Sequence, residues 1–83
     1  MAYTLSANIC DGNDYVAHWD GGTYDEYETA FFHYVTWEPP RQEVEAVLDE
    51  YRALGDDLSE FDLQIGVWDE DGNDVLFWSE GIE

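Results

Sequence analysis

Apolar and polar residues alternate along the N-terminal segment, and this period of two predicts a β-strand with one apolar face. The strand ends near Cys10, and its apolar positions are Tyr3, Leu5, Ala7 and Ile9. Asp-Gly-Asn-Asp at positions 11–14 then favours a tight turn, because Asp and Asn bond their own backbone and Gly accepts positive φ. The β-prone segment 15–19 completes a hairpin, which we expect to end at the Asp-Gly-Gly sequence 20–22.

The segment 24–37 fits two structures. Its second half, 31–37, is rich in β-branched and aromatic residues that would suit a central strand. A helix has the better geometry, because Thr23 and Glu26 have the spacing of a capping box and the apolar residues repeat along one side of a 3.6-residue spiral. Those apolar residues are Tyr24, Tyr27, Phe31, Tyr34 and Val35. We favour the helix and keep the strand as the alternative.

A second helix is predicted after two consecutive prolines. Pro39 and Pro40 end the preceding element and suit the first turn of a helix, where a missing N–H costs nothing. The apolar residues that follow recur at i, i+3, i+4 and i+7, which is the pattern of an amphipathic helix. They are Val44, Val47, Leu48, Tyr51 and Leu54. Gly55 follows them as the expected C-terminal cap.

A second hairpin is predicted at the end of the chain. Residues 61–68 alternate in hydropathy, 69–74 form a turn, and 75–79 return as a strand. The element order is therefore ββ(α)αββ. This order favours an α+β fold in which one or two helices cover one face of an antiparallel four-stranded sheet and water covers the other. We expect residues 1–83 to form a single compact domain.

The composition makes this domain strongly acidic. The 83 residues include 21 Asp and Glu but only two Lys and Arg, so the formal net charge is -19. Direct binding to nucleic acid or to an anionic membrane is therefore not expected. Hydrophobic residues still make up 45% of the chain, which favours a folded protein over a disordered one.

Two further features indicate a cytoplasmic protein. Uncharged segments such as 29–37 are too short to cross a bilayer, and the N-terminus does not have the pattern of a signal peptide. The single cysteine, Cys10, cannot form an internal disulfide, whereas small secreted domains usually depend on several. We therefore expect a reducing cytoplasm.

The sequence contains little that favours catalysis. Among 21 acids some pair always has the spacing of a general acid and base, so paired carboxylates are uninformative without a cleft. His18 and His33 do not have metal-ligand spacing with each other or with Cys10, and the chain has no Lys to hold a phosphate. We expect neither enzymatic activity nor a cofactor.

The second hairpin turn resembles the start of a calcium loop, because three Asp residues surround a glycine. The residues concerned are Asp69, Asp71, Gly72 and Asp74. A calcium loop would need a bidentate Glu where Trp78 stands, and a helix where a strand is predicted. We therefore expect a tight turn and no metal site.

The acidic groups themselves point to a partner. They occur in runs with almost no basic residue nearby, and their mutual repulsion costs stability. Proteins that bind DNA line their grooves with Lys and Arg, and carboxylates on a small rigid fold can occupy the same grooves. In size, charge and near absence of basic residues the chain resembles the DNA-mimic inhibitors of phages and other mobile elements, chiefly anti-CRISPR and antirestriction proteins.

This resemblance covers the whole chain but carries no motif, so it assigns no residue. It implies an inhibitor that binds a basic nucleic-acid-binding partner, such as a CRISPR effector or a restriction enzyme, in the cytoplasm of the host cell. Two alternatives stay open: a halophilic cytoplasmic protein with a solvation-driven acidic surface, and an acidic adaptor that docks on a basic protein without imitating DNA. Fourteen aromatic residues argue against the halophilic protein.

We chose the acids that are expected to bind the partner by their position in the predicted fold. Hairpin turns and exposed helix flanks face solvent, so their carboxylates can enter a basic groove without disturbing the core. The candidate partner-binding residues are Asp11, Asp14, Glu43, Glu45, Asp49, Glu50, Asp69, Glu70, Asp71 and Asp74. If recognition lies elsewhere, Trp68 and Tyr15 are the next candidates.

Overall fold

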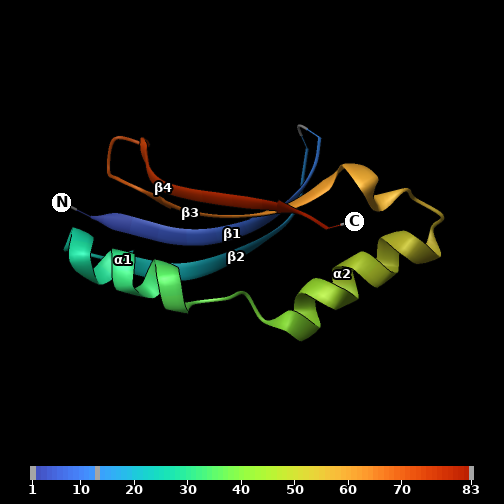
Figure 1. Ribbon diagram of the computed structural model, residues 1–83, viewed down its shortest axis with the longest axis horizontal. Helices are drawn as coiled ribbons and strands as arrows, with labels where there is room; N and C mark the ends of the chain where they lie inside the picture. The colour runs from blue at the N-terminus through green and yellow to red at the C-terminus, as the bar shows by residue number, and fades with distance from the viewer. Residues whose placement is uncertain (1, 13, 83) are drawn as a thin grey trace.

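A computed structural model describes residues 2–12 and 14–82, so Asn13 of the first predicted turn lies outside the described residues. The elements are β1 (Tyr3–Asp11), β2 (Asp14–Tyr24), α1 (Tyr27–Thr36), α2 (Arg41–Ala53), the 3-10 turn η1 (Leu58–Glu60), β3 (Phe61–Trp68) and β4 (Asp74–Gly81). Both helices lie on the same side of a curved sheet (Figure 1). The predicted α+β fold is confirmed, with the order ββααββ.

The sheet joins the two hairpins through its central strands. The strand order is β2-β1-β3-β4, and each neighbouring pair is antiparallel. Between β1 and β3, Thr4 lies opposite Trp68 and Asp11 lies opposite Phe61. The β1–β2 turn and the β3–β4 turn are therefore at opposite ends of the sheet (Figure 1).

Strand β2 is longer than predicted, because the Asp-Gly-Gly sequence at 20–22 does not end it. The strand continues to Tyr24, and Gly21 is the extra residue of a β-bulge beside Leu5 of β1. A Cβ atom at Gly21 would lie 2.7 Å from Leu5 Cγ, so only glycine lets the strand pass this core residue. Gly22 follows with a φ of 106°, a conformation that favours glycine.

The helical interpretation of segment 24–37 is confirmed, and the strand alternative is wrong. The helix is shorter than expected, from Tyr27 to Thr36. The predicted capping box does not form: Thr23 belongs to β2, and Glu26 is the N-cap residue but makes no side-chain cap hydrogen bond. Continuation of the strand to Tyr24 leaves no room for a cap at Thr23.

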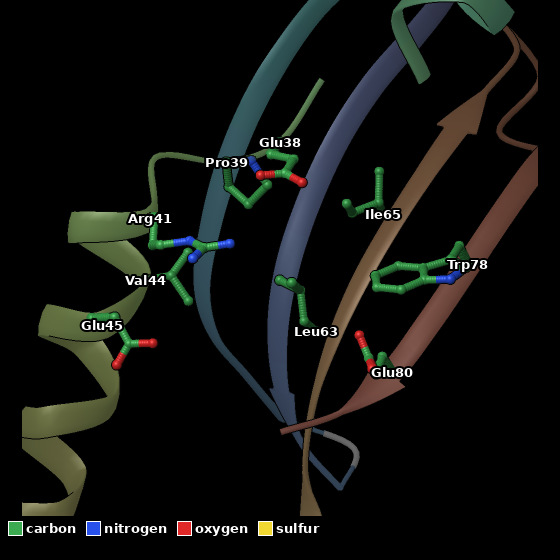
Figure 2. Close-up of a pocket in the computed structure, with 9 residues that line it drawn as sticks. All are labelled: Glu38, Pro39, Arg41, Val44, Glu45, Leu63, Ile65, Trp78 and Glu80. Carbon is green, nitrogen blue, oxygen red and sulfur yellow. The ribbon is translucent and has the colours of Figure 1, made fainter. Parts of the chain in front are cut away.

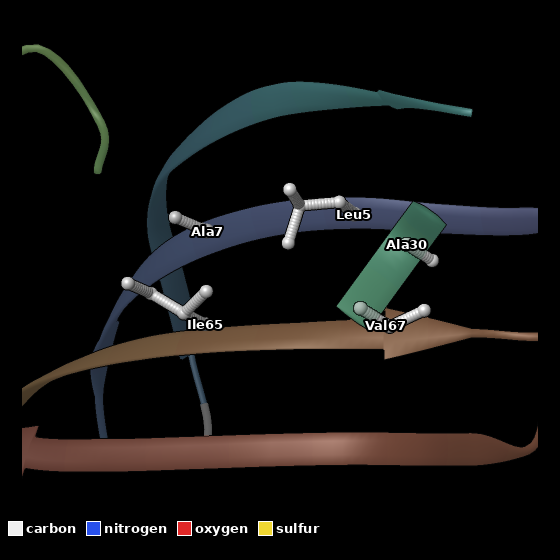
Figure 3. Packing of buried hydrophobic residues seen from close by; sticks show 5 residues of the cluster. All are labelled: Leu5, Ala7, Ala30, Ile65 and Val67. Carbon is white, nitrogen blue, oxygen red and sulfur yellow. The ribbon is translucent and has the colours of Figure 1, made fainter. Parts of the chain in front are cut away.

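The predicted apolar side of this first helix is also wrong in part. Ala30 is its buried residue, packed against Leu5 of β1 and Val67 of β3 (Figure 3). The small side chain lets the helix approach the sheet closely, while Tyr34 is only partly buried against the same cluster. The aromatic and branched residues on the remaining surface of α1 are exposed: Tyr27, Phe31, Phe32 and Val35.

Helix α2 agrees with its prediction except at its two ends. It begins at Arg41 with Pro40 as its N-cap residue, so the prolines precede the first turn and do not form part of it. Leu48 is buried, and it is accompanied by partly buried residues of the predicted stripe: Val44, Val47 and Tyr51. Leu54 is 73% exposed because it follows the last helical residue, so its assignment to the stripe is wrong. Gly55 has a φ of 83° and donates its N–H to the Arg52 carbonyl at 3.0 Å, which confirms the glycine cap.

The core has two parts, one under each helix. Under α1 it contains Leu5, Ala7, Ala30, Ile65 and Val67. Under α2 it contains Ile9, Leu48, Leu58 and Phe61. The turn η1, which the sequence pattern did not predict, supplies Leu58 to the second part.

The sheet face opposite the helices was expected to be wet, and it is only partly so. Ser6 and Cys10 alternate with the core residues of β1 and therefore point to this face, yet both are buried. Gly66 shares the face, with the rings of Trp68 and Phe77 close to the position of its absent Cβ. Aromatic rings thus cover part of the face that water was expected to cover.

Candidate functional site

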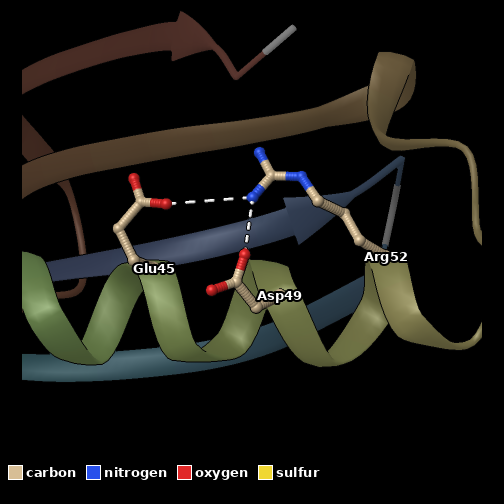
Figure 4. Close-up of polar contacts among 3 residues, drawn as sticks. All are labelled: Glu45, Asp49 and Arg52. Carbon is tan, nitrogen blue, oxygen red and sulfur yellow. Dashed lines mark hydrogen bonds and ion pairs between the residues drawn. The ribbon is translucent and has the colours of Figure 1, made fainter.

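The four candidate carboxylates of α2 are exposed along one helix. They belong to Glu43, Glu45, Asp49 and Glu50. Arg52 Nη1 lies 3.0 Å from Asp49 Oδ1 and 3.8 Å from Glu45 Oε2, so one guanidinium bridges two of these acids (Figure 4). Exposed ion pairs of this kind contribute little stability, and here they reduce the like-charge repulsion expected between positions 45 and 49.

The β3–β4 turn uses one of its carboxylates to build itself. Asp69 Oδ1 accepts hydrogen bonds from the backbone N–H groups of Asp71 and Asn73, at 3.0 and 2.9 Å. Gly72 has a φ of 82°, which completes the turn. Asp69 is therefore a turn-forming residue, whereas the carboxylates of Asp71 and Asp74 are exposed.

Glu70 in the same turn binds the N-terminal segment, because its Oε1 accepts a hydrogen bond from the backbone N–H of Ala2. The calcium-loop pattern is thus replaced by contacts within the protein. Within residues 2–12 and 14–82, no three His, Cys, Asp or Glu side chains are placed to hold a metal ion.

At the other end of the sheet, Asp11 and Asp14 face each other across the first hairpin. Asp14 is exposed and Asp11 is partly buried. Gly12 donates its N–H to the Glu60 carbonyl at 3.4 Å, which joins this turn to η1. The ten candidate acids therefore do not meet in one site. They are distributed over both ends of the sheet and along α2.

Both histidines have contacts within the fold. His18 Nδ1 lies 2.7 Å from Asn8 Oδ1 on the neighbouring strand. The ring of His33 stacks on the ring of Tyr24, with centroids 4.4 Å apart and an angle of 9° between the planes. These contacts fit the interpretation of both residues as ordinary surface or half-buried histidines.

A groove that the sequence analysis missed lies between the start of α2 and the β3–β4 half of the sheet (Figure 2). It has a volume of about 290 Å³. Ile65 pairs with Trp78 and Leu63 pairs with Glu80, so two apolar residues, an indole and a carboxylate share this surface. Only the long-range register between β3 and β4, together with the position of α2, assembles the groove.

Cys10 is a buried free thiol on the opposite face of the sheet. Burial raises the pKa of the thiol above its ordinary value of 9.0, and the Asp62 carboxylate on the paired position of β3 raises this pKa further. The protonated thiol is therefore favoured in the folded state, and Cys10 is not an activated nucleophile.

This raised pKa predicts a loss of stability at alkaline pH. A group whose folded pKa lies above its unfolded pKa contributes stability in full below the unfolded pKa and loses it as the pH rises toward the folded pKa. We expect the urea midpoint to fall between about pH 8 and pH 10 more steeply for the parent than for Cys10→Ala. Equal slopes for the two proteins would contradict this assignment of the pKa shift.

Comparison with known proteins identifies no relative: no family model, curated protein or solved structure matches the chain at a significant level. Within the part of the chain that the structure describes, no helix is both long and apolar enough to span a membrane. The function of the protein is therefore inferred from its own charge, shape and surface.

Proposed function

We propose that this protein is an acidic DNA mimic that inhibits a host defence complex, most simply as an anti-CRISPR or antirestriction protein. It occupies the basic surface through which a CRISPR effector or a restriction enzyme binds DNA. The observation that carries the proposal is the density of charge along an elongated body.

The body measures 43 × 24 × 15 Å along its principal axes. A net charge of -19 over the 43 Å axis is about one negative charge per 2.3 Å. Duplex DNA carries one charge per roughly 1.7 Å of its axis, so the two linear densities are similar. A groove lined with Lys and Arg would therefore meet a potential of similar sign and strength on this protein.

The distribution of the carboxylates supports the same proposal. Acids at the two hairpin turns place negative charge at opposite ends of the sheet, and the acids of α2 follow a helix that extends beyond the sheet (Figure 1). A partner that reads a phosphate backbone makes many separate contacts rather than one dominant contact. A dispersed acidic surface suits such a partner better than a single acidic site would.

The exposed apolar residues of α1 favour a partner-binding protein over a halophilic one. Phe31, Phe32 and Val35 are exposed on a helix whose only acidic residue is Glu28. A surface shaped solely by the need for hydration would not keep large apolar groups in water.

Salt separates these two explanations. We expect the protein to be folded at about 10 mM salt and to gain thermal stability between about 10 mM and 1 M, because screening reduces the repulsion among its carboxylates. Circular dichroism melts at the two concentrations measure this. Unfolding in the dilute buffer would favour the halophilic protein instead.

The proposed activity is tested by competition gel shifts. Purified CRISPR effectors and restriction enzymes are loaded with labelled target DNA, and the protein is added at increasing molar ratio. We expect displacement of DNA from at least one complex near equimolar ratio, with no shift of the DNA by the protein alone. Binding to a complex that keeps its DNA would indicate an acidic adaptor, and binding to none would contradict the proposal.

A further inference from the structure

The groove beside α2 lies over the part of β3 and β4 between the two helix contacts, which α1 makes at Val67 and α2 makes at Phe61 (Figure 2). Leu63 and Ile65 form its floor, with Pro39 and Val44 on the opposite wall. Trp78 lies on the strand at the edge and is 42% exposed, so a large apolar ring faces an open space. A groove of this kind can take an extended apolar stem.

The charged residues at the groove are mainly acidic. Glu38, Glu45 and Glu80 line it together with a single cation, Arg41. These four side chains carry a formal charge of about -2, and Glu45 also lies near Arg52 at 3.8 Å. Charge complementarity therefore favours a cationic occupant over an anionic one.

We propose that this groove receives one arginine side chain of the basic partner. The aliphatic stem would lie on Leu63 and Ile65, and the planar guanidinium would stack on the Trp78 indole while it pairs with Glu80. Arginine suits this arrangement better than lysine, because its flat, weakly hydrated head group both stacks and donates in pairs to a carboxylate.

This inference rests on the proposed function in one respect, namely that the partner presents arginine. It adds one specific contact to a surface that otherwise attracts by dispersed charge. A buried aromatic–arginine contact at the centre of an interface is the kind that determines the dissociation rate, whereas rim charges mainly determine the association rate.

The test uses the full chain labelled with ¹⁵N and the peptide acetyl-Gly-Arg-Gly-amide. We expect the peptide to shift the Trp78 indole N–H signal, and the matched lysine peptide to bind at least threefold more weakly. Trp78→Leu and Glu80→Gln should each weaken binding of the arginine peptide at least fivefold. Phe77→Leu is the control, because Phe77 precedes Trp78 but belongs to the other face of the sheet.

The variant Arg41→Ala tests whether the group that enters the groove carries a positive or a negative charge. Removal of this cation should leave binding of the arginine peptide unchanged or tighten it. Loss of binding in Arg41→Ala, an unmoved Trp78 signal, or equal effects of Trp78→Leu and Phe77→Leu would each overturn the groove assignment. The ¹⁵N spectrum of each variant shows whether it is folded.

The same variants in the gel-shift competition separate this inference from the proposed function. One outcome would overturn the groove assignment and leave the DNA-mimic proposal in place. In it, the parent and Trp78→Leu displace DNA equally, and the arginine peptide does not shift the Trp78 indole N–H signal of the parent. A clear arginine site without displacement from any defence complex would support the groove and contradict the inhibitor.

Discussion

Phe61→Ala should destabilise the protein by about 3–5 kcal/mol, which is most of the stability of a domain of this size. Phe61 is 1% exposed, and its ring meets the Tyr51 ring edge-on with centroids 5.3 Å apart. It belongs to the core cluster that joins α2, η1 and the sheet. Its loss leaves a cavity where three elements meet, so we expect a mainly unfolded chain at 37 °C.

Urea denaturation at 25 °C measures this effect, and Phe32→Ala is the matched control. Phe32 is 60% exposed on α1, so its truncation should change the free energy of unfolding by no more than about 0.5 kcal/mol. Similar destabilisation by the two substitutions would show that the α2 part of the core is not organised around Phe61.

The second large effect concerns inhibition. The combined substitution Glu43→Gln, Asp49→Asn and Glu50→Gln should weaken inhibition about tenfold, because each exposed charge contributes a fraction of the binding free energy and three of them add. Any one of these changes alone should have a small effect. The measurement is the half-inhibitory ratio in the DNA-displacement assay, with circular dichroism to show that the variant is folded.

The charge-preserving variant Glu43→Asp, Asp49→Glu and Glu50→Asp is the control, and it should inhibit as the parent does. A parallel set at the β3–β4 turn should change Asp71 and Asp74 but leave Asp69, whose carboxylate forms the turn. If both neutralised variants are folded and fully inhibitory, recognition is carried by aromatic residues. Tyr15 is exposed and Trp68 is partly buried, so Tyr15 would then be tested first.

Local patterns predicted those parts of the fold that local physics determines. Alternation in β1 and β3 and the i, i+3, i+4 spacing of α2 each reflect burial of one face, so the sequence displays them directly. The end of β2 was missed because Gly-Gly is normally a terminator, whereas here Gly21 makes space for Leu5. That reason exists only after the two strands have paired.

The α1 helix shows a second limit of sequence patterns. Aromatic residues occur on more than one side of it, and hydrophobicity alone could not show that Ala30 would be the residue against the sheet. Close packing selected the small residue over the larger ones. The same limit applies to the candidate site. The sequence pattern could place acids on turns and on a helix flank. It could not predict the groove at Trp78, which depends on the register between β3 and β4 and on the position of α2.

The order β2-β1-β3-β4 leaves two strand edges open, and this has a consequence for colloidal behaviour. Open edges carry unpaired N–H and C=O groups that can join another sheet, and many proteins block them with Lys or Pro. Neither residue occurs in β2 or β4. Besides the bulges in these strands, mutual repulsion between copies opposes edge-to-edge stacking, and it vanishes near the isoelectric point of about 4.1. Acidification therefore removes the electrostatic part of the protection of these edges.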